Sequence, residues 1–217
     1  MPTSPGVSRK YPQHYPAPRK YALVIGCVDC RLLDDLVRFL DHDNLTNRYY
    51  QATFAGCAIG LSSKAPVYYP RCDTAGKPMG PAMDFSKWQA AALDHLKLVL
   101  KLTKGDLTDV YIVEHADCGA YREFIGFDSG TDPDREREKH TEYALAFAQE
   151  LMAWYESPEG KELAAELSAR YGAEVRPPLV RGFLMDLRGG VDPLFDPPAT
   201  GKKPKKARHP EPDEHYM

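Results

Sequence analysis

Short apolar runs alternate along the chain with longer segments whose apolar positions recur at helical spacing. The runs that predict β-strands are YALVIGC (21–27), YYQATFA (49–55), DVYIVEH (109–115) and LVRGFLMDL (179–187). Residues three or four positions apart carry apolar side chains in 33–40, 85–102 and 134–170, which predicts helices. Strands that alternate with helices are typical of βαβ units, so we expect an α/β fold with a mostly parallel central sheet and helices on both faces.

Polar and proline-rich segments divide the chain further. Ser157, Pro158 and Gly160 predict that the segment 134–170 breaks into two helices. Residues 1–20 lack periodicity and predict an extended arm, and 191–217 predict a tail rich in proline and lysine. Between them we expect one domain over 21–190. Residues 61–84 form a long loop within it that resembles an insertion.

Composition narrows the class of protein. The 217 residues are 43% hydrophobic and 27% charged, as in a globular domain, and the net charge of −3 argues against nucleic acid as a partner. An apolar leader or membrane-spanning run is not visible, so we expect a cytoplasmic protein without a membrane partner. Five cysteines are an odd number in a chain of this size, which favours free or metal-bound thiols over disulfides.

Two of the predicted strands end in side chains that suit a soft metal ion. Cys27 closes the first strand, and His115 and Cys118 follow the third with two residues between them. The working edge of a parallel sheet lies beyond the carboxyl ends of its strands, so these groups are expected to meet there. A catalytic zinc takes three Cys or His ligands and leaves a fourth position open. Cys27, His115 and Cys118 therefore make a candidate zinc site.

Asp29 and Arg31 follow Cys27 closely. Side chains two positions apart on an extended chain point the same way, so the two can form a charge-assisted hydrogen bond beside the metal. Asp29 could then be a fourth zinc ligand, or it could accept a hydrogen bond from zinc-bound water. Two other interpretations involve Cys30: a redox pair with Cys27, or a closed structural zinc site with Cys27, His115 and Cys118.

The remaining candidates have simpler interpretations. The charged run 134–140 is typical of a solvated helix face, and His140 on it is expected to be a surface or hydrogen-bonded residue. Neither Cys57 nor Cys72 stands at a metal-ligand spacing from one of the two candidate groups, so we expect no ligand role for them.

The motifs C-x-D-x-R (27–31) and H-x-x-C (115–118) together resemble the β-carbonic anhydrases. The similarity extends in element order over about 20–190. It includes the helix rich in Ala and Leu before the second motif, the Ala55-Gly56 pair and the late segment GFLMDL (182–187). Each half is a weak signal by itself. The two motifs together, in the right order and each on a βα unit, are a strong signal for the family.

This resemblance implies a zinc-dependent lyase (a carbonate dehydratase) that reversibly hydrates carbon dioxide to bicarbonate with a zinc-bound hydroxide. Cys27, His115 and Cys118 would hold Zn²⁺, and the pair Asp29 and Arg31 would open the fourth position or let Asp29 fill it. The resemblance also implies a homodimer or a dimer of dimers. Since two thiolates donate much charge to the metal, we expect the activity to rise on the alkaline side of neutral.

The chain differs from the family pattern at several positions. Cys30 stands where the family commonly has Ser, Glu114 where it has Gly, and Thr53-Phe54 where it has Arg-Asn. These differences leave the metal ligands intact. They keep two alternatives open: hydrolysis of carbonyl sulfide or carbon disulfide on the same scaffold, and a non-catalytic zinc-binding protein with an altered pocket.

Overall fold

The computed structural model describes residues 21–127 and 131–195, which form a five-stranded sheet in the order β2-β1-β3-β4-β5. The strands are β1 (Tyr21–Cys27), β2 (Tyr49–Phe54), β3 (Leu107–His115), β4 (Leu179–Met185) and β5 (Val191–Phe195). The first four run parallel to their neighbours, and β5 pairs antiparallel with β4 at the edge. The predicted mostly parallel sheet is confirmed. The predicted arm lies outside the described residues.

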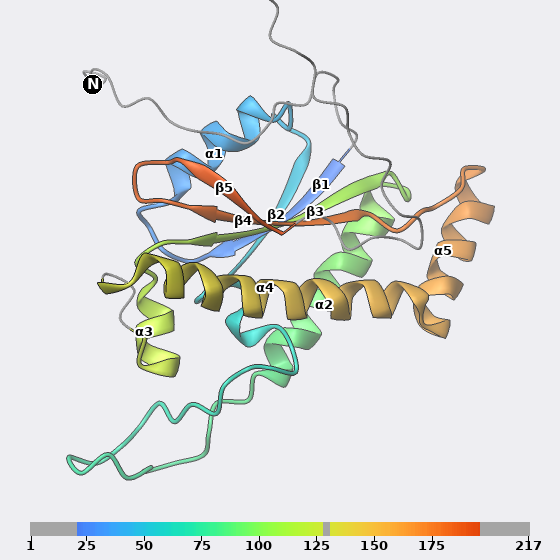
Figure 1. The fold of residues 1–217 in the computed structure, drawn as a ribbon. Coiled ribbons are helices and arrows are strands. Elements are labelled where there is room, and N and C mark those ends of the chain that lie inside the picture. Colours follow the sequence, from blue (N-terminus) through green and yellow to red (C-terminus); the bar gives the residue numbers. More distant parts are fainter. Residues whose placement is uncertain (1–20, 128–130, 196–217) are drawn as a thin grey trace, which may run out of the picture.

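Helices cover both faces of this sheet, as Figure 1 shows with α1 on one side and α2 and α4 on the other. The helices are α1 (Leu33–His42), the short 3-10 helix η1 (Cys57–Gly60), α2 (Ser86–Leu102), α3 (Gly119–Ile125), α4 (Pro133–Glu156) and α5 (Pro158–Tyr171). None of the described helices is long and apolar enough to span a membrane.

The central strands are apolar throughout because both of their faces are buried. In β1, Ala22 and Val24 pack under α1, while Leu23 and Ile25 face α2, α4 and η1. The α1 side also includes Phe39, whose ring lies near two aromatic rings of the sheet. Two separate apolar clusters thus hold the sheet between its helices.

The break between the two long helices is at the predicted place. The Ser157 hydroxyl accepts a hydrogen bond from the Gly160 N–H at 3.2 Å, and Pro158 is the first residue of α5. A capping hydroxyl followed by proline is a strong start signal for a helix.

Two predictions from the sequence are wrong at the end of a segment. The tail predicted from residue 191 onward begins later, because Val191–Phe195 form β5. Val191 and Leu194 are buried there, so the apolar positions of a proline-containing segment were sufficient for an edge strand. The apolar spacing within 85–102 also predicts that Leu102 lies on the buried side of its helix, whereas it falls at the end of α2 and is 54% exposed. Residues 196–217 lie outside the described part of the chain.

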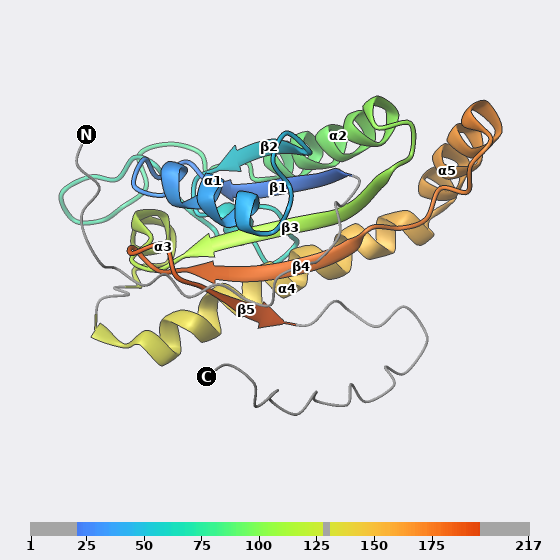
Figure 2. The ribbon, with the colours of Figure 1, turned by 90° about the horizontal axis from the view of Figure 1, so that it is seen from above.

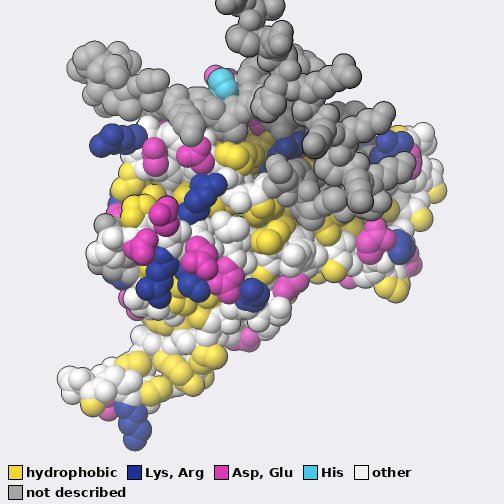
Figure 3. Space-filling view, viewed as in Figure 1, with side chains coloured by type: hydrophobic (Ala, Val, Ile, Leu, Met, Phe, Trp, Pro, Cys, Tyr) yellow, Lys and Arg dark blue, Asp and Glu magenta, His cyan; other side chains and the backbone are white. Residues whose placement is uncertain are grey.

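Residues 61–85 form a long loop that joins η1 to α2, seen at the lower left of Figure 1. An isolated β-bridge between Cys72 and Pro78 links its two arms, and so does the hydrogen bond from the Met83 N–H to the Tyr68 carbonyl oxygen at 2.7 Å. In the space-filling view of Figure 3 this loop projects from the body with many apolar side chains on its surface. Val67 and Met79 are among them, and both are more than half exposed.

Candidate metal site

Cys27, His115 and Cys118 meet at the carboxyl edge of the sheet, where Figure 2 shows the arrowheads of the parallel strands pointing the same way. The site forms because β1 and β3 are neighbours in register, with Gly26 opposite Val113, so that the residues after them emerge together. The donor atoms of the three side chains all lie within 4.8 Å of one another, and the two sulfur atoms are 4.0 Å apart. The folded chain thus brings together the three side chains that the sequence suggests as metal ligands.

The two thiols have different proton affinities. The hydrogen bond with Cys118 and the nearby His115 lower the pKa of Cys27 to about 4, against the opposing effect of burial, while the same sulfur contact and burial raise the pKa of Cys118. The Gly56 N–H also donates to the Cys27 sulfur at 3.3 Å. The lowered pKa favours the thiolate form of Cys27, which is the form that binds a metal ion, and a divalent ion would displace the proton of Cys118.

His115 presents one nitrogen to this cluster. Its Nδ1 lies 2.9 Å from the carbonyl oxygen of Ala116, which can only accept, so Nδ1 is the donor and Nε2 is the ring nitrogen that faces the cluster. Nε2 is fully buried, and among the described residues it has no hydrogen-bond partner. A buried nitrogen without a partner is costly unless something binds it. This atom beside two sulfurs fits a zinc ion.

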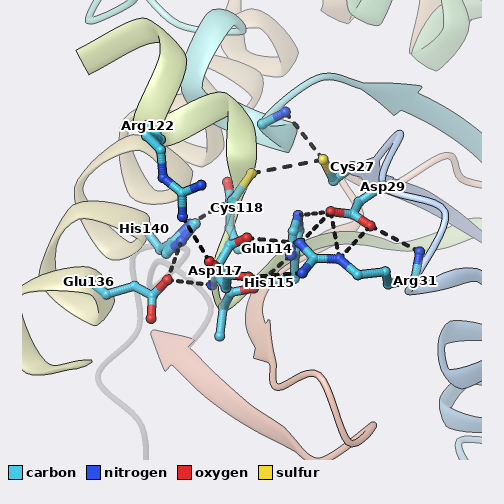
Figure 4. A network of polar contacts seen from close by, with 12 residues as sticks. Cys27, Asp29, Arg31, Glu114, His115, Asp117, Cys118, Arg122, Glu136 and His140 are labelled. Carbon is cyan, nitrogen blue, oxygen red and sulfur yellow. Dashed lines mark hydrogen bonds and ion pairs between the residues drawn. The ribbon is translucent and has the colours of Figure 1, made fainter. Parts of the chain in front are cut away.

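Asp29 and Arg31 form the expected pair, although not through strand alternation. Both come after β1 has ended, in a turn where the Arg31 N–H donates to Asp29 Oδ1 at 2.9 Å. The guanidinium also donates to the carboxylate, with Nε 3.0 Å from Oδ1 and Nη2 2.7 Å from Oδ2. These bonds lower the pKa of Asp29 to about 2. Figure 4 shows this fork with the carboxylate next to His115, whose Nε2 is 3.9 Å from Oδ2.

Arg31 makes a second set of contacts with Asp117, inside the H-x-x-C motif. Its Nη1 donates to Asp117 Oδ2 at 2.8 Å and its Nη2 to the Asp117 carbonyl oxygen at 2.9 Å. Arg122 on α3 donates to the other carboxylate oxygen at 3.1 Å. The pKa of Asp117 is lowered, mainly by Arg31. The arginine therefore joins the two halves of the site.

Behind the H-x-x-C motif lies a buried cluster of two carboxylates and a histidine. His140 Nδ1 is 3.0 Å from Glu114, whose other oxygen accepts from the Ala58 N–H at 3.0 Å. Glu136, one turn before His140 on α4, accepts from the Asp117 N–H at 2.6 Å. Burial lowers the pKa of His140, but the two carboxylates outweigh it and raise the pKa to about 9. A positive charge on His140 thus balances part of this acidic cluster.

The charged run 134–140 is therefore not a wholly solvated face. Glu136 is 6% exposed and His140 is completely buried. The two are four positions apart, which places them on one side of the helix, and that spacing is the signal by which they could have been found. Periodicity of charged residues does not by itself tell which side packs inward.

Cys30 lies apart from the cluster. Its side chain is exposed, and within the part of the chain that the structure describes only Cys27, His115 and Cys118 converge in this way. The buried Cys57 donates to the carbonyl of Ile25, and Cys72 is exposed in the long loop. The arrangement thus favours three protein ligands over a closed set of four that includes Cys30.

A cavity of about 310 Å³ opens beside Cys27 and Asp29. Apolar side chains make up most of its wall, and they include Leu33, Leu36 and Met185. A small uncharged molecule could approach the cluster along this wall without competing for strong polar groups.

Comparisons with known proteins give sparse similarity in sequence. No protein-family model matches the chain. An uncharacterized protein of Rickettsia bellii (strain RML369-C) is 21% identical over 120 residues, which are 55% of this chain and 60% of that protein. The chain thus spans less than two thirds of the length of this curated relative.

The solved structures that the chain resembles include β-carbonic anhydrases. A tetrameric enzyme of Sordaria macrospora covers 84% of each chain at 11% identity, with a TM-score of 0.39. The enzyme CafA of Aspergillus fumigatus covers 82% of this chain and 78% of its own at 16% identity, also with a TM-score of 0.39. The enzyme TvaCA1 of Trichomonas vaginalis covers 87% and 89% at 12% identity, with a TM-score of 0.32.

Proposed function

We propose that this chain is a zinc enzyme that reversibly hydrates carbon dioxide to bicarbonate. The observation that carries the proposal is the convergence of the two sulfurs of Cys27 and Cys118 with the buried Nε2 of His115, which has no hydrogen-bond partner in the described part of the chain. When bound by such a set, zinc lowers the pKa of water from 15.7 toward about 7 and so supplies a nucleophile near neutral pH.

The residues around the cluster suit this chemistry. Asp29 stays ionised above about pH 2, and its carboxylate can accept a hydrogen bond from the group that attacks the substrate. Arg31 holds that carboxylate by two N–H groups, which fixes its direction. Asp29 is not one of the three residues whose donor atoms converge within 4.8 Å, so in this arrangement it stands beside the ligand set as a gate.

The apolar cavity supports a small uncharged substrate. Leu33 and Leu36 of α1 line it next to Asp29, where they would exclude water from one side of the reacting carbon. Carbon dioxide has no charge to be desolvated on entry, which suits a mostly apolar wall.

A second candidate is hydrolysis of carbonyl sulfide or carbon disulfide. The observation that favours it is the same cavity, since about 310 Å³ with a mostly apolar wall also accommodates these larger, polarisable molecules. The same ligand set would serve, and only the substrate would differ.

The decisive experiment is stopped-flow hydration of carbon dioxide by the zinc-loaded protein between pH 7 and 9. We expect a zinc-dependent rate that is lost in Cys118→Ser. Carbonyl sulfide and carbon disulfide are assayed on the same preparation. Zinc bound in one equivalent with no rate on any of the three substrates would favour the non-catalytic zinc-binding alternative and overturn the proposal.

A homo-oligomer belongs to the same proposal. Val28, Leu33 and Val37 are exposed apolar side chains at or near the mouth of the site, and each is at least 46% accessible. Burial of such a group against a second copy would remove apolar surface from water. Light scattering coupled to size exclusion tests this: we expect a dimer or larger assembly, and a monomer at micromolar concentration would contradict it.

A further inference from the structure

We propose that Asp117 and Glu136 are positioning residues that hold the Arg31 guanidinium, and through it the Asp29 carboxylate, in register with the metal ligands. The inference rests on the proposed function of the site. It concerns a chain of four side chains that begins on α4 and ends beside His115.

The first step is the double attachment of Arg31. One edge of its guanidinium binds Asp29, and the remaining N–H groups bind the side chain and the carbonyl of Asp117. A planar group held at both edges has little freedom to rotate. The Asp29 carboxylate therefore takes its direction from a residue of the loop that also supplies His115 and Cys118.

The second step is the backbone of Asp117. Its φ of +55° lies in the left-handed region, which aspartate and asparagine tolerate better than most residues. Its N–H donates to Glu136 at 2.6 Å, so that the strained turn is held from behind by a buried carboxylate. In this conformation the carboxylate and the backbone carbonyl oxygen of Asp117 both face Arg31, as Figure 4 shows.

The third step is the support of Glu136 itself. His140 lies one turn further along α4, with Nε2 3.9 Å from Glu136 and Nδ1 hydrogen-bonded to Glu114. Because Glu114 directly precedes the ligand His115, the cluster ties α4 to the end of β3. Contacts with α4 thus hold the turn that contains Asp117 and, through Arg31, the Asp29 carboxylate.

The expected effect is on orientation, because an ion pair that is partly exposed adds little to folding stability. Arg31 and Asp117 have side chains 43% and 38% exposed. A small displacement of a positioned group can still reduce a rate by one or two orders of magnitude.

The test uses Asp117→Asn, which keeps the left-handed backbone and removes the charge that binds Arg31. The full chain is loaded with Co²⁺, whose visible absorption reports the geometry around the metal, and with Zn²⁺ for kinetics. We expect full metal content, an altered Co²⁺ spectrum and a kcat about tenfold lower with little change in KM. In an Arg31→Ala background the same substitution should change both readouts less than about twofold, because its effect passes through Arg31.

Two comparisons separate positioning from general damage. Glu142→Gln removes a carboxylate from the same helix, where Glu142 contacts Lys139 and Lys64, and should leave the Co²⁺ spectrum unchanged. Glu136→Gln keeps an oxygen acceptor for the Asp117 N–H, so it should retain the native spectrum better than Glu136→Ala does.

Overturning results are a native spectrum and rate in Asp117→Asn, or an effect of that substitution that persists in full without Arg31. The Co²⁺ spectrum and the hydration rate also distinguish a failure of this inference from a failure of the proposed function. If the native protein hydrated no carbon dioxide, the proposed function would fail, and the Co²⁺ spectra of the single and double variants would still decide whether Asp117 positions Arg31.

Discussion

Arg31 and Asp117 are 86 residues apart in the chain, and the arginine donates to both the carboxylate and the backbone carbonyl of that aspartate, at 2.8 and 2.9 Å. This contact joins the turn after β1 to the turn after β3. The candidate metal ligands flank the same two turns, since Cys27 ends β1, His115 ends β3 and Cys118 directly precedes α3. Pairing of β1 with β3 therefore brings the two parts of the site together.

Metal binding should depend on the three converging side chains. We expect one zinc per chain, and Cys118→Ser should weaken zinc affinity at least about tenfold because an alcohol is a poor substitute for a thiolate. Zinc should also raise the melting temperature of the native protein and not of the variant. Elemental analysis after dialysis and thermal denaturation measure both effects. The matched controls are Cys30→Ser and Cys72→Ser, and loss of zinc in either would contradict this ligand set.

The rate of carbon dioxide hydration should rise between pH 7 and 9. Two thiolate ligands donate more charge to zinc than imidazoles do, so the coordinated water is acidified less than at a site of three histidines. Protonation of Asp29 does not contribute in this range, since its pKa lies near 2. Stopped-flow rates at constant ionic strength test this, and a profile that is already flat from pH 6 upward would be evidence against it.

Gly56→Ala should destabilise the protein and disturb the site. Gly56 has a φ of +73°, and an added Cβ would lie 2.6 Å from Ile59 Cγ2 and 3.0 Å from Ala120 Cβ. Its N–H also donates to the Cys27 sulfur. We expect a loss of about 2 to 4 kcal/mol in the free energy of unfolding, from backbone strain and overpacking together.

The matched control is Gly126→Ala. Gly126 also has a positive φ, of +65°, but no atom lies within 4 Å of its added Cβ. Gly126→Ala should lower the free energy of unfolding through backbone strain alone, by about 1 to 2 kcal/mol. Urea denaturation of both variants gives the difference, and equal losses would show that the contacts around Gly56 are unimportant.

The contribution of His140 to stability should decrease as the pH rises. Its pKa is about 9 in the folded chain against 6.5 for the unperturbed side chain, so the folded state binds the proton more tightly. The resulting stabilisation is complete below about pH 6.5 and is lost as the pH passes 9, with a total on the order of 3 kcal/mol.

The measurement compares the native protein with His140→Gln in urea at several pH values, with zinc in excess throughout. The difference in unfolding free energy between the two should shrink from pH 6 to pH 9.5. A difference that does not change with pH would mean that the pKa of His140 is the same in the folded and the unfolded protein, and a difference that grows with pH would mean that folding lowers it.

The sequence by itself determined most of the regular elements and the grouping of three candidate metal ligands. Local periodicity predicts strands and helices, as in 21–27 and 33–40, and Ser157 with Pro158 marks a helix start without any distant contact. Cys27, His115 and Cys118 could be grouped because each follows the end of a predicted parallel strand, and parallel strands in one sheet end at one edge.

Only the tertiary structure decided which other residues belong to the site. Asp117, Glu136 and His140 owe their roles to the packing of α4 behind the ligand loop, and the charged pattern of that helix does not reveal which of its sides is buried. The edge strand β5 likewise exists because β4 offers it a partner. Contacts between segments far apart in the chain depend on the packing of whole elements, which local patterns do not encode.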